Sequence, residues 1–105
     1  MESEVFRRPK TVPAIVQIII TQAVWHRAAS AISDTVFEEQ IRRIAHEELE
    51  PRGLILLVRE LPAGRTRFLV KERDTGTVCD MLEFAADGMP ERVSAGASGK
   101  INVIN

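Results

Sequence analysis

The chain has 105 residues, the length of one domain, and its apolar fraction of 45% and charged fraction of 28% are ordinary for a globular protein. A formal net charge of −1 argues against bulk attraction to nucleic acid or anionic membrane, so such a partner would need a local patch. The single cysteine, Cys79, excludes an internal disulfide. Four phenylalanines, one tryptophan and no tyrosine weaken any function based on base stacking.

The N-terminal third contains one long apolar segment. Residues 1–11 are polar and predict a flexible arm, whereas residues 14–33 contain neither glycine nor proline. That length without a helix breaker favours a helix, but the β-branched residues favour a buried strand, so both interpretations stay open for 14–25. As a helix, the segment would be apolar on nearly every side of its first three turns and would need covering on more than one face.

The same segment has some features of an N-terminal targeting signal. Arg7, Arg8 and Lys10 precede the apolar run, and the small residues "AASA" at 28–31 follow it, which together resemble a secretory signal peptide. His26 and Arg27 stand where a cleavage region should be neutral and small. The run is also too short for a membrane span, which takes about 20 mostly apolar residues. We therefore expect a cytoplasmic protein without a membrane span, with a cleaved signal as the alternative.

A second helix is predicted between residues 35 and 50. Thr35 followed three residues later by Glu38 is typical of a capping box, and Pro51 and Gly53 mark the end. Apolar residues recur at intervals of three and four along one face: Phe37, Ile41, Ile44, Ala45 and Leu49. This pattern indicates a surface helix that packs through one stripe.

The periodicity then changes to that of strands. Residues 54–61 form an aliphatic run, and residues 66–73 and 77–84 alternate around the turn Asp74-Thr75-Gly76. The sequence thus predicts an α+β fold over residues 1–85, with two helices packed on one face of a three-stranded antiparallel β-meander in a two-layer sandwich. Residues 86–105 predict a mostly flexible tail, although "INVIN" at its end could add an edge strand.

The hairpin faces follow from pairing Arg73 with Thr77. One face carries the residues expected in the core: Phe68, Val70, Val78, Leu82 and Phe84. The other carries four cations, Arg65, Arg67, Lys71 and Arg73, and places Cys79 among them. This basic face is either a solvated sheet surface, with Arg67 paired to Glu83, or a site for phosphate or another polyanion.

Few residues suggest chemistry. Asp80 falls on the core face, where it either lies at the rim or meets an arginine, or serves as a functional acid. His46 lacks the second histidine that a zinc-protease helix needs four residues later, and Cys79 has no histidine near it in the sequence. We therefore predict no catalytic residue, no metal site and no cofactor.

The hairpin resembles that of the flagellar FlaG family, small bacterial proteins with a helix followed by a β-meander. The matching positions are Glu72, Thr75, Gly76, Val78 and Leu82. Asp80 departs from the family pattern, which prefers a base there, and Glu83 stands where proline is preferred. The resemblance implies a non-enzymatic accessory role in flagellar filament assembly.

Two functional hypotheses follow from these residues. The first is a non-enzymatic protein–protein interaction or assembly module that forms a homodimer, because one helix and a small sheet cannot cover the apolar surface of 14–25. The expected contacts are Ile15, Ile18, Ile19 and Trp25. The second is a small regulatory protein that binds nucleic acid or another polyanion through Arg65, Arg67, Lys71 and Arg73.

Overall fold

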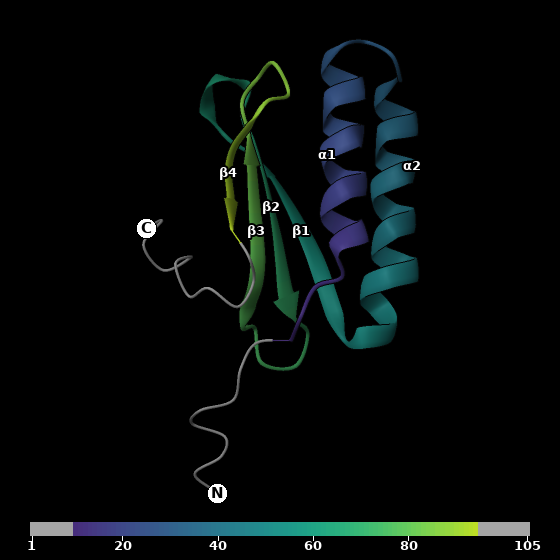
Figure 1. The fold of residues 1–105 in the computed structure, drawn as a ribbon, viewed down its shortest axis with the longest axis vertical. Coiled ribbons are helices and arrows are strands. Elements are labelled where there is room, and N and C mark those ends of the chain that lie inside the picture. The colour runs from purple at the N-terminus through teal and green to yellow at the C-terminus, as the bar shows by residue number, and fades with distance from the viewer. Residues whose placement is uncertain (1–9, 95–105) are drawn as a thin grey trace, which may run out of the picture.

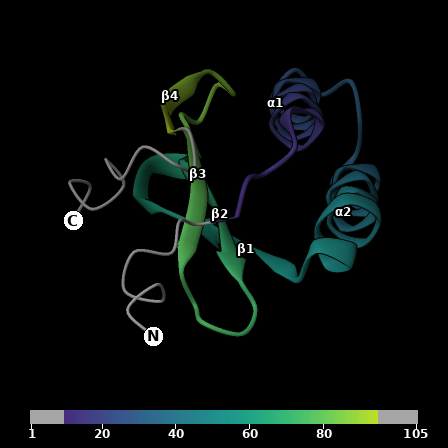
Figure 2. The ribbon, with the colours of Figure 1, turned by 60° about the horizontal axis from the view of Figure 1, so that its bottom comes forward.

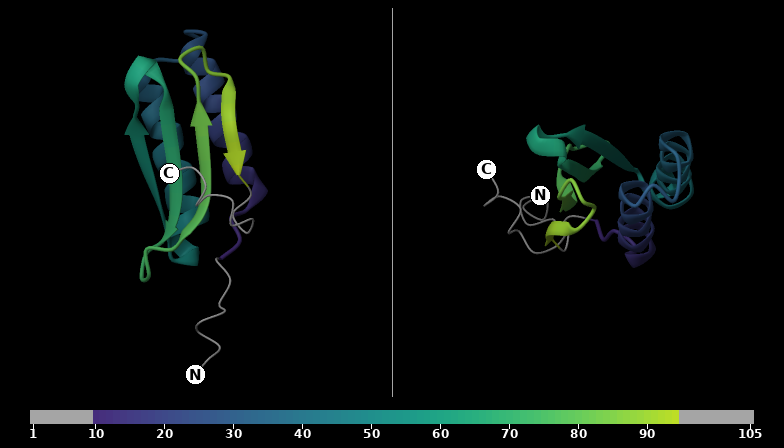
Figure 3. Two further views of the ribbon diagram at one scale, coloured as in Figure 1. Left: turned by 90° about the vertical axis from the view of Figure 1, so that its left-hand side faces the viewer. Right: turned by 90° about the horizontal axis from the view of Figure 1, so that it is seen from above.

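The computed structural model describes residues 10–94 and has two layers. The helices α1 (Ala14–Ala28) and α2 (Asp34–Ile44) are followed by the strands β1 (Leu54–Glu60), β2 (Thr66–Glu72), β3 (Val78–Phe84) and β4 (Pro90–Ser94). The strands form one antiparallel sheet in the order β1-β2-β3-β4. Both helices cover the same face (Figures 1 and 3), with α1 on the β4 side and α2 on the β1 side (Figure 2). The predicted α+β class is confirmed.

The sheet has one strand more than the sequence predicted. β4 pairs with β3 through contacts such as Leu82 with Val93, so the sheet extends past residue 85 into the segment expected to be a flexible tail. A turn with Gly88 at a φ of +89° brings the chain back for this pairing. Residues 95–105, including "INVIN", and residues 1–9 of the predicted arm lie outside the described residues.

The first apolar segment is a helix, as its length indicated. α1 begins directly after Pro13 and ends at Ala28, earlier than the predicted end at residue 33. Ser30 then adopts a left-handed φ of 61°, which reverses the chain toward α2. The residues that α1 buries are Val16, Ile20, Ala23 and Val24.

The second helix begins differently from the prediction. α2 starts at Asp34, and Ser33 is its N-cap, with its hydroxyl accepting a hydrogen bond of 3.2 Å from the Val36 N–H. The predicted Thr35 capping box is therefore wrong, because Thr35 already lies within the first turn. The chain continues through a π-helical turn (Ala45–Leu49) and a 3-10 turn (Glu50–Arg52), and ends with Gly53 in the left-handed region as predicted.

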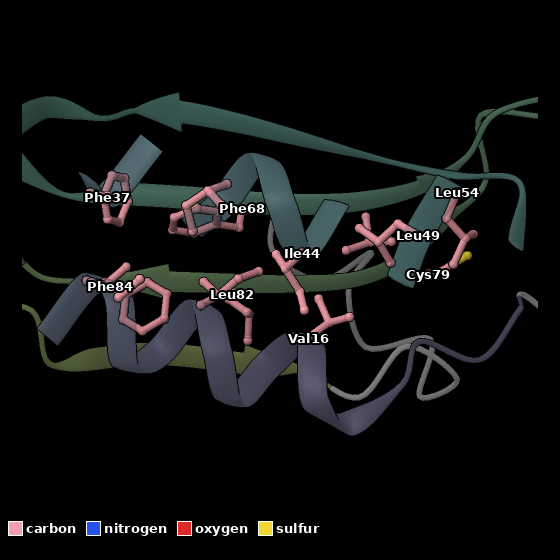
Figure 4. Packing of buried hydrophobic residues seen from close by; sticks show 14 residues of the cluster. Val16, Phe37, Ile44, Leu49, Leu54, Phe68, Cys79, Leu82 and Phe84 are labelled. Atoms are coloured by element: carbon pink, nitrogen blue, oxygen red, sulfur yellow. The ribbon is translucent and has the colours of Figure 1, made fainter. Parts of the chain in front are cut away.

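The predicted hairpin register is confirmed from Thr66 to Val70, where Phe68 faces Leu82 and Arg67 faces Glu83. Beyond Val70 the register shifts by a β-bulge, so that Lys71 faces Val78. The extra residue turns Cys79 into the core (Figure 4), and its predicted place on the basic face is wrong. Val78, predicted in the core, is only half-buried because it faces Lys71.

Aromatic rings organise the core beneath the two helices. Phe68 of β2 lies between Phe37 of α2 and Phe84 of β3, with ring centroids 6.4 and 5.8 Å apart in edge-to-face geometry. Leu49 and Leu54 close the opposite end of the core beside Cys79 (Figure 4). The sheet and the inner faces of both helices therefore share one hydrophobic core.

Candidate functional site

The outer face of α1 carries the most exposed apolar surface of the helical layer. Ile15, Ile18 and Trp25 are 41%, 49% and 50% exposed, although the helix buries its opposite side in the core. Together with the exposed Gln22 they follow the spacing i, i+3, i+7, i+10, which places all four on one side of the helix. We call these four residues the α1 stripe.

Ile19 borders the α1 stripe but is less exposed than its members, although the sequence grouped it with the same contacts. Its side chain is half-buried and packs against the core cluster. It also lines a hollow of about 280 Å³ between the two helices, together with Ile44 and His26. The structure therefore brings Ile15, Ile18 and Trp25 together at the surface and places Ile19 in the helix–helix contact.

Part of the predicted basic face is neutralised by carboxylates. The Arg67 Nε lies 2.6 Å from Oε2 of Glu83, as the register predicted, and Glu83 is only 5% exposed. Arg65 lies 3.5 Å from the same carboxylate and 3.0 Å from Glu91 of β4. Two of the four predicted cations are thus matched by two carboxylates.

Three cations line the outer face of the sheet nearer the β1 edge, and one of them is the Glu83-paired Arg67. Lys71 and Arg67 line a hollow of about 310 Å³ on the outer face of the sheet, and Arg59 of β1 joins them there. Arg59 faces Arg67 across β1 and β2, a pairing that the sequence analysis missed because it needs the β1–β2 register. Arg73 is exposed beyond the end of β2.

A second hollow, of about 530 Å³, separates α2 from β1 on the helix-covered side of the sheet. Its apolar lining consists of Phe37, Ile41, Ala45, Leu56 and Val58. The Arg27 guanidinium lies 3.9 Å above the Phe37 ring at one end, where it also donates to the Thr66 hydroxyl over 3.5 Å. We call this hollow the α2–β1 groove. No sequence pattern marked it, because it depends on how far α2 reaches over the sheet.

The buried titratable residues Asp80 and Cys79 of β3 each form a hydrogen bond with a nearby backbone group. Asp80 is 6% exposed and accepts a 2.9 Å hydrogen bond from the Met81 N–H, while burial raises the pKa of its carboxyl to about 6. Burial, followed by the nearby charge of Glu72, raises the pKa of the Cys79 thiol, which makes its reactive thiolate scarcer. The thiol donates to the Thr77 carbonyl over 3.7 Å.

The remaining candidates for chemistry lie at the surface. His46 Nδ1 is 2.9 Å from Oε1 of Glu50 one helical turn away, and both side chains are exposed. Within residues 10–94, no three side chains of histidine, cysteine, aspartate or glutamate gather as a metal site would require.

Neither helix in the described part of the chain has the length and apolar character needed to cross a membrane. No family model matches the sequence, and comparisons with curated proteins and with solved structures give no match either. The likeness of the hairpin to the FlaG family stays a prediction.

Proposed function

We propose that this protein is a non-enzymatic interaction module that associates with a second copy of itself through the α1 stripe. The observation that carries the proposal is the exposure of Ile15, Ile18 and Trp25 on one side of a helix whose other side is packed in the core. Exposed apolar side chains aligned on one side of a helix are typical of protein–protein interfaces.

The spacing of the α1 stripe suits helix–helix packing. Intervals of three and four residues are those by which two helices interdigitate along a coiled-coil seam, and Gln22 supplies one polar position within it. The stripe spans about 15 Å along the axis, at about 1.5 Å per residue. A two-fold axis would place the same stripe on both partners, which is the commonest arrangement in homo-oligomers.

Light scattering tests the proposal directly. The wild-type protein at micromolar concentration should have twice the monomer mass of 11.7 kDa. Ile18→Asp should give a folded monomer, because that side chain is half-exposed and is not a member of the buried cluster. Val36→Asp is the matched control, since Val36 is also exposed but lies in the first turn of α2.

Trp25 provides an independent readout, because it is the only tryptophan in the sequence. Its half-exposed ring should leave water on association, so its emission should shift to shorter wavelength as protein concentration rises. The Ile18→Asp variant should show no such shift. A wild-type protein that stays monomeric with unchanged emission would contradict the proposal.

The flagellar setting that the hairpin resemblance implies is compatible with such a module. A self-associating helix face could join copies of this chain beside a filament, and association through α1 is expected whatever the setting.

Polyanion binding is the second candidate function, favoured by Arg59 and Lys71, which line one hollow together with the Glu83-paired Arg67. Retention on heparin at low salt that falls steeply as salt is added would support it. Lys71→Glu should then abolish retention, and Arg65→Glu should have less effect, because Arg65 is already paired with two carboxylates. No retention at low salt would remove this candidate.

A further inference from the structure

Among the described residues, no strand pairs with the outer edge of β1, so the backbone groups along that edge have no partner strand there. Within residues 10–94, β1 lies at the end of the sheet and pairs with β2 alone, in seven consecutive pairs without a register shift. Just beyond the strand ends, the Leu61 N–H donates to the Arg65 carbonyl and the Arg73 N–H donates to the Gly53 carbonyl, both over 2.8 Å. These two bonds identify the odd-numbered residues as those that bond to β2.

In an antiparallel ladder, residues that bond to the neighbouring strand alternate with residues that do not. This alternation fixes the direction of the backbone groups of the even-numbered residues of β1. Even-numbered residues of β1, including Leu56 and Val58, direct their N–H and C=O groups away from β2 toward the open edge. Each of these residues could exchange two hydrogen bonds with one residue of an added antiparallel strand. The edge therefore offers a regular row of donors and acceptors.

The two edges of the sheet differ in how they are protected. β4 begins with Pro90, and its pairing with β3 has a register shift next to Phe84. Proline and irregular pairing are common devices against unwanted strand addition. β1 has neither proline nor lysine, and its ladder is regular along its whole length.

The side chains of β1 also suit a strand with neighbours on both sides. Its first five residues are all aliphatic, a pattern that is typical of strands covered on both faces. Yet Leu57 on the outer face and Val58 on the helix-covered face are 42% and 46% exposed. This is the exposure expected for a strand that lacks one neighbour.

The α2–β1 groove can receive the side chains of an added strand. In an antiparallel strand, the residues opposite Leu56 and Val58 would point to the same face as these two side chains, and so into the groove. Phe37, Ile41 and Ala45 form the facing apolar wall. Backbone bonds at the edge and alternate side chains in a groove together are the recognition mode of β-augmentation.

Charge distinguishes the two ends of the groove. Asp34, Glu38 and Glu60 line the end where α2 begins and β1 finishes (Figure 1). Arg27 lies at this end too, but it is engaged by the Phe37 ring and the Thr66 hydroxyl. A cation of the added strand opposite Glu60 would therefore meet an excess of carboxylates. Arg42, farther along α2, disfavours a second cation on that strand.

We infer that the β1 edge and the α2–β1 groove bind an extended segment of a partner protein as a fifth, antiparallel strand. Because the added strand runs from Glu60 toward Leu54, its pattern is a lysine or arginine followed by aliphatic residues at the second and fourth positions after it. This surface is separate from the α1 stripe, so the inference does not depend on self-association through α1.

The peptide acetyl-Lys-Thr-Val-Thr-Val-Thr-Val-Gly-Cys-amide, labelled with fluorescein on its cysteine thiol, is a suitable probe, and its binding can be followed by fluorescence anisotropy. N-methylation of its first valine, opposite Val58, should weaken binding by about tenfold or more, because it removes a donor and adds bulk at the edge. N-methylation of the first threonine should have little effect, because its N–H points away from β1. Glutamate in place of the lysine should bind more weakly.

Variants of the protein test the same contacts from the other side. Val58→Pro should abolish binding and leave the fold intact, because the N–H that it removes points to the open edge. Val58→Thr is the matched control, since it keeps the N–H and the β-branched shape. Glu38→Lys should shift the preference toward the glutamate peptide, and amide exchange at Leu56 and Val58 should slow when the wild-type protein binds peptide.

These experiments distinguish a partner segment from a second copy of β1 as the strand bound at the edge. Equal binding of the two N-methylated peptides, or no binding at all, would overturn the inference. A dimer that Val58→Pro dissociates and Ile18→Asp leaves intact would place a second copy of β1 at this edge, and would overturn the partner segment as occupant. The peptide titration repeated in the Ile18→Asp variant isolates the groove from any association through α1.

Discussion

Glu83 holds Arg67 across the middle of the sheet, with 2.6 Å between Oε2 and Nε, although the carboxylate is almost inaccessible to water. A buried carboxylate that loses its cation is costly, because its desolvation is no longer offset. Arg67→Met keeps the aliphatic part of the side chain and should lower the free energy of unfolding by about 2 kcal/mol, since Arg65 can compensate only in part.

Urea denaturation measures this effect, with Arg59→Met as control. Arg59 faces Arg67 directly, so its removal should cost less or even stabilise the sheet by relieving like-charge repulsion. Adding Glu83→Gln to Arg67→Met should restore part of the loss. Equal losses for Arg59→Met and Arg67→Met would show that the pair contributes nothing beyond packing.

The raised pKa of Asp80 predicts how stability varies with pH. Its carboxyl has a pKa of about 6 in the fold against a reference value of 3.8, so the folded state binds the proton more tightly. Stability should therefore fall as pH rises from about 4 to about 6, and Asp80 should cost roughly 3 kcal/mol above that range. Below about pH 4 both states are protonated and the cost disappears.

Asp80→Asn separates this effect from the other titrating groups. The amide cannot ionise but can still accept the Met81 N–H. The variant should be more stable than wild type near pH 8 and similar to it near pH 4, by urea denaturation at each pH. The exposed Thr35→Ala on α2, which changes no titratable group, should shift stability equally at the two pH values.

Local patterns predicted the elements of the fold well. Alternation along β2 and β3 was sufficient to predict the register from Thr66 to Val70. Each side chain lies on one of the two faces of the sheet, and the short turn between the strands fixes which residues pair. The bulge at Cys79 was not predictable in this way, since one extra residue leaves the apolar pattern of β3 almost unchanged. β4 was missed because Gly88 and Pro90 indicate a turn, and its pairing comes only from β3.

The sequence predicted a candidate surface only where a single helix or strand forms it. The exposure of Ile18 and Trp25 follows from a helix that is apolar on more sides than a single sheet can cover. The α2–β1 groove instead depends on contacts between distant elements, and Arg59 joins the basic face only through the β1–β2 register. Such surfaces require tertiary structure, which periodicity along the chain does not contain.

The N-cap of α2 offers a test of one local sequence signal that gave a wrong prediction. Ser33→Ala removes the hydroxyl that accepts the Val36 N–H and should lower stability by about 1 kcal/mol. Thr35→Ala should change stability by less than about 0.5 kcal/mol, because its side chain is exposed inside the first turn. Thermal unfolding followed by circular dichroism compares the two, and a larger loss for Thr35→Ala would place the cap at Thr35 after all.

The β3–β4 turn packs closely against α1 at Gly88, because this residue has no side chain. A Cβ there would lie 2.8 Å from the Ala28 Cβ and 3.3 Å from the Val24 carbonyl oxygen, and the φ of +89° already disfavours other residues. Gly76 in the β2–β3 turn has a similar φ of +76°, but nothing lies within 4 Å of a Cβ placed on it. The two positions therefore separate backbone strain from steric contact.

Gly76→Ala should cost about 1 kcal/mol from backbone strain alone, whereas Gly88→Ala should cost about 3 kcal/mol because α1 and the turn must move apart. Urea denaturation gives both values. Ala28→Gly added to Gly88→Ala should recover part of the loss, since it removes the nearest atom and leaves the strain in place. Equal losses at the two glycines would mean that the turn does not press on α1, and that β4 is held by its pairing with β3 alone.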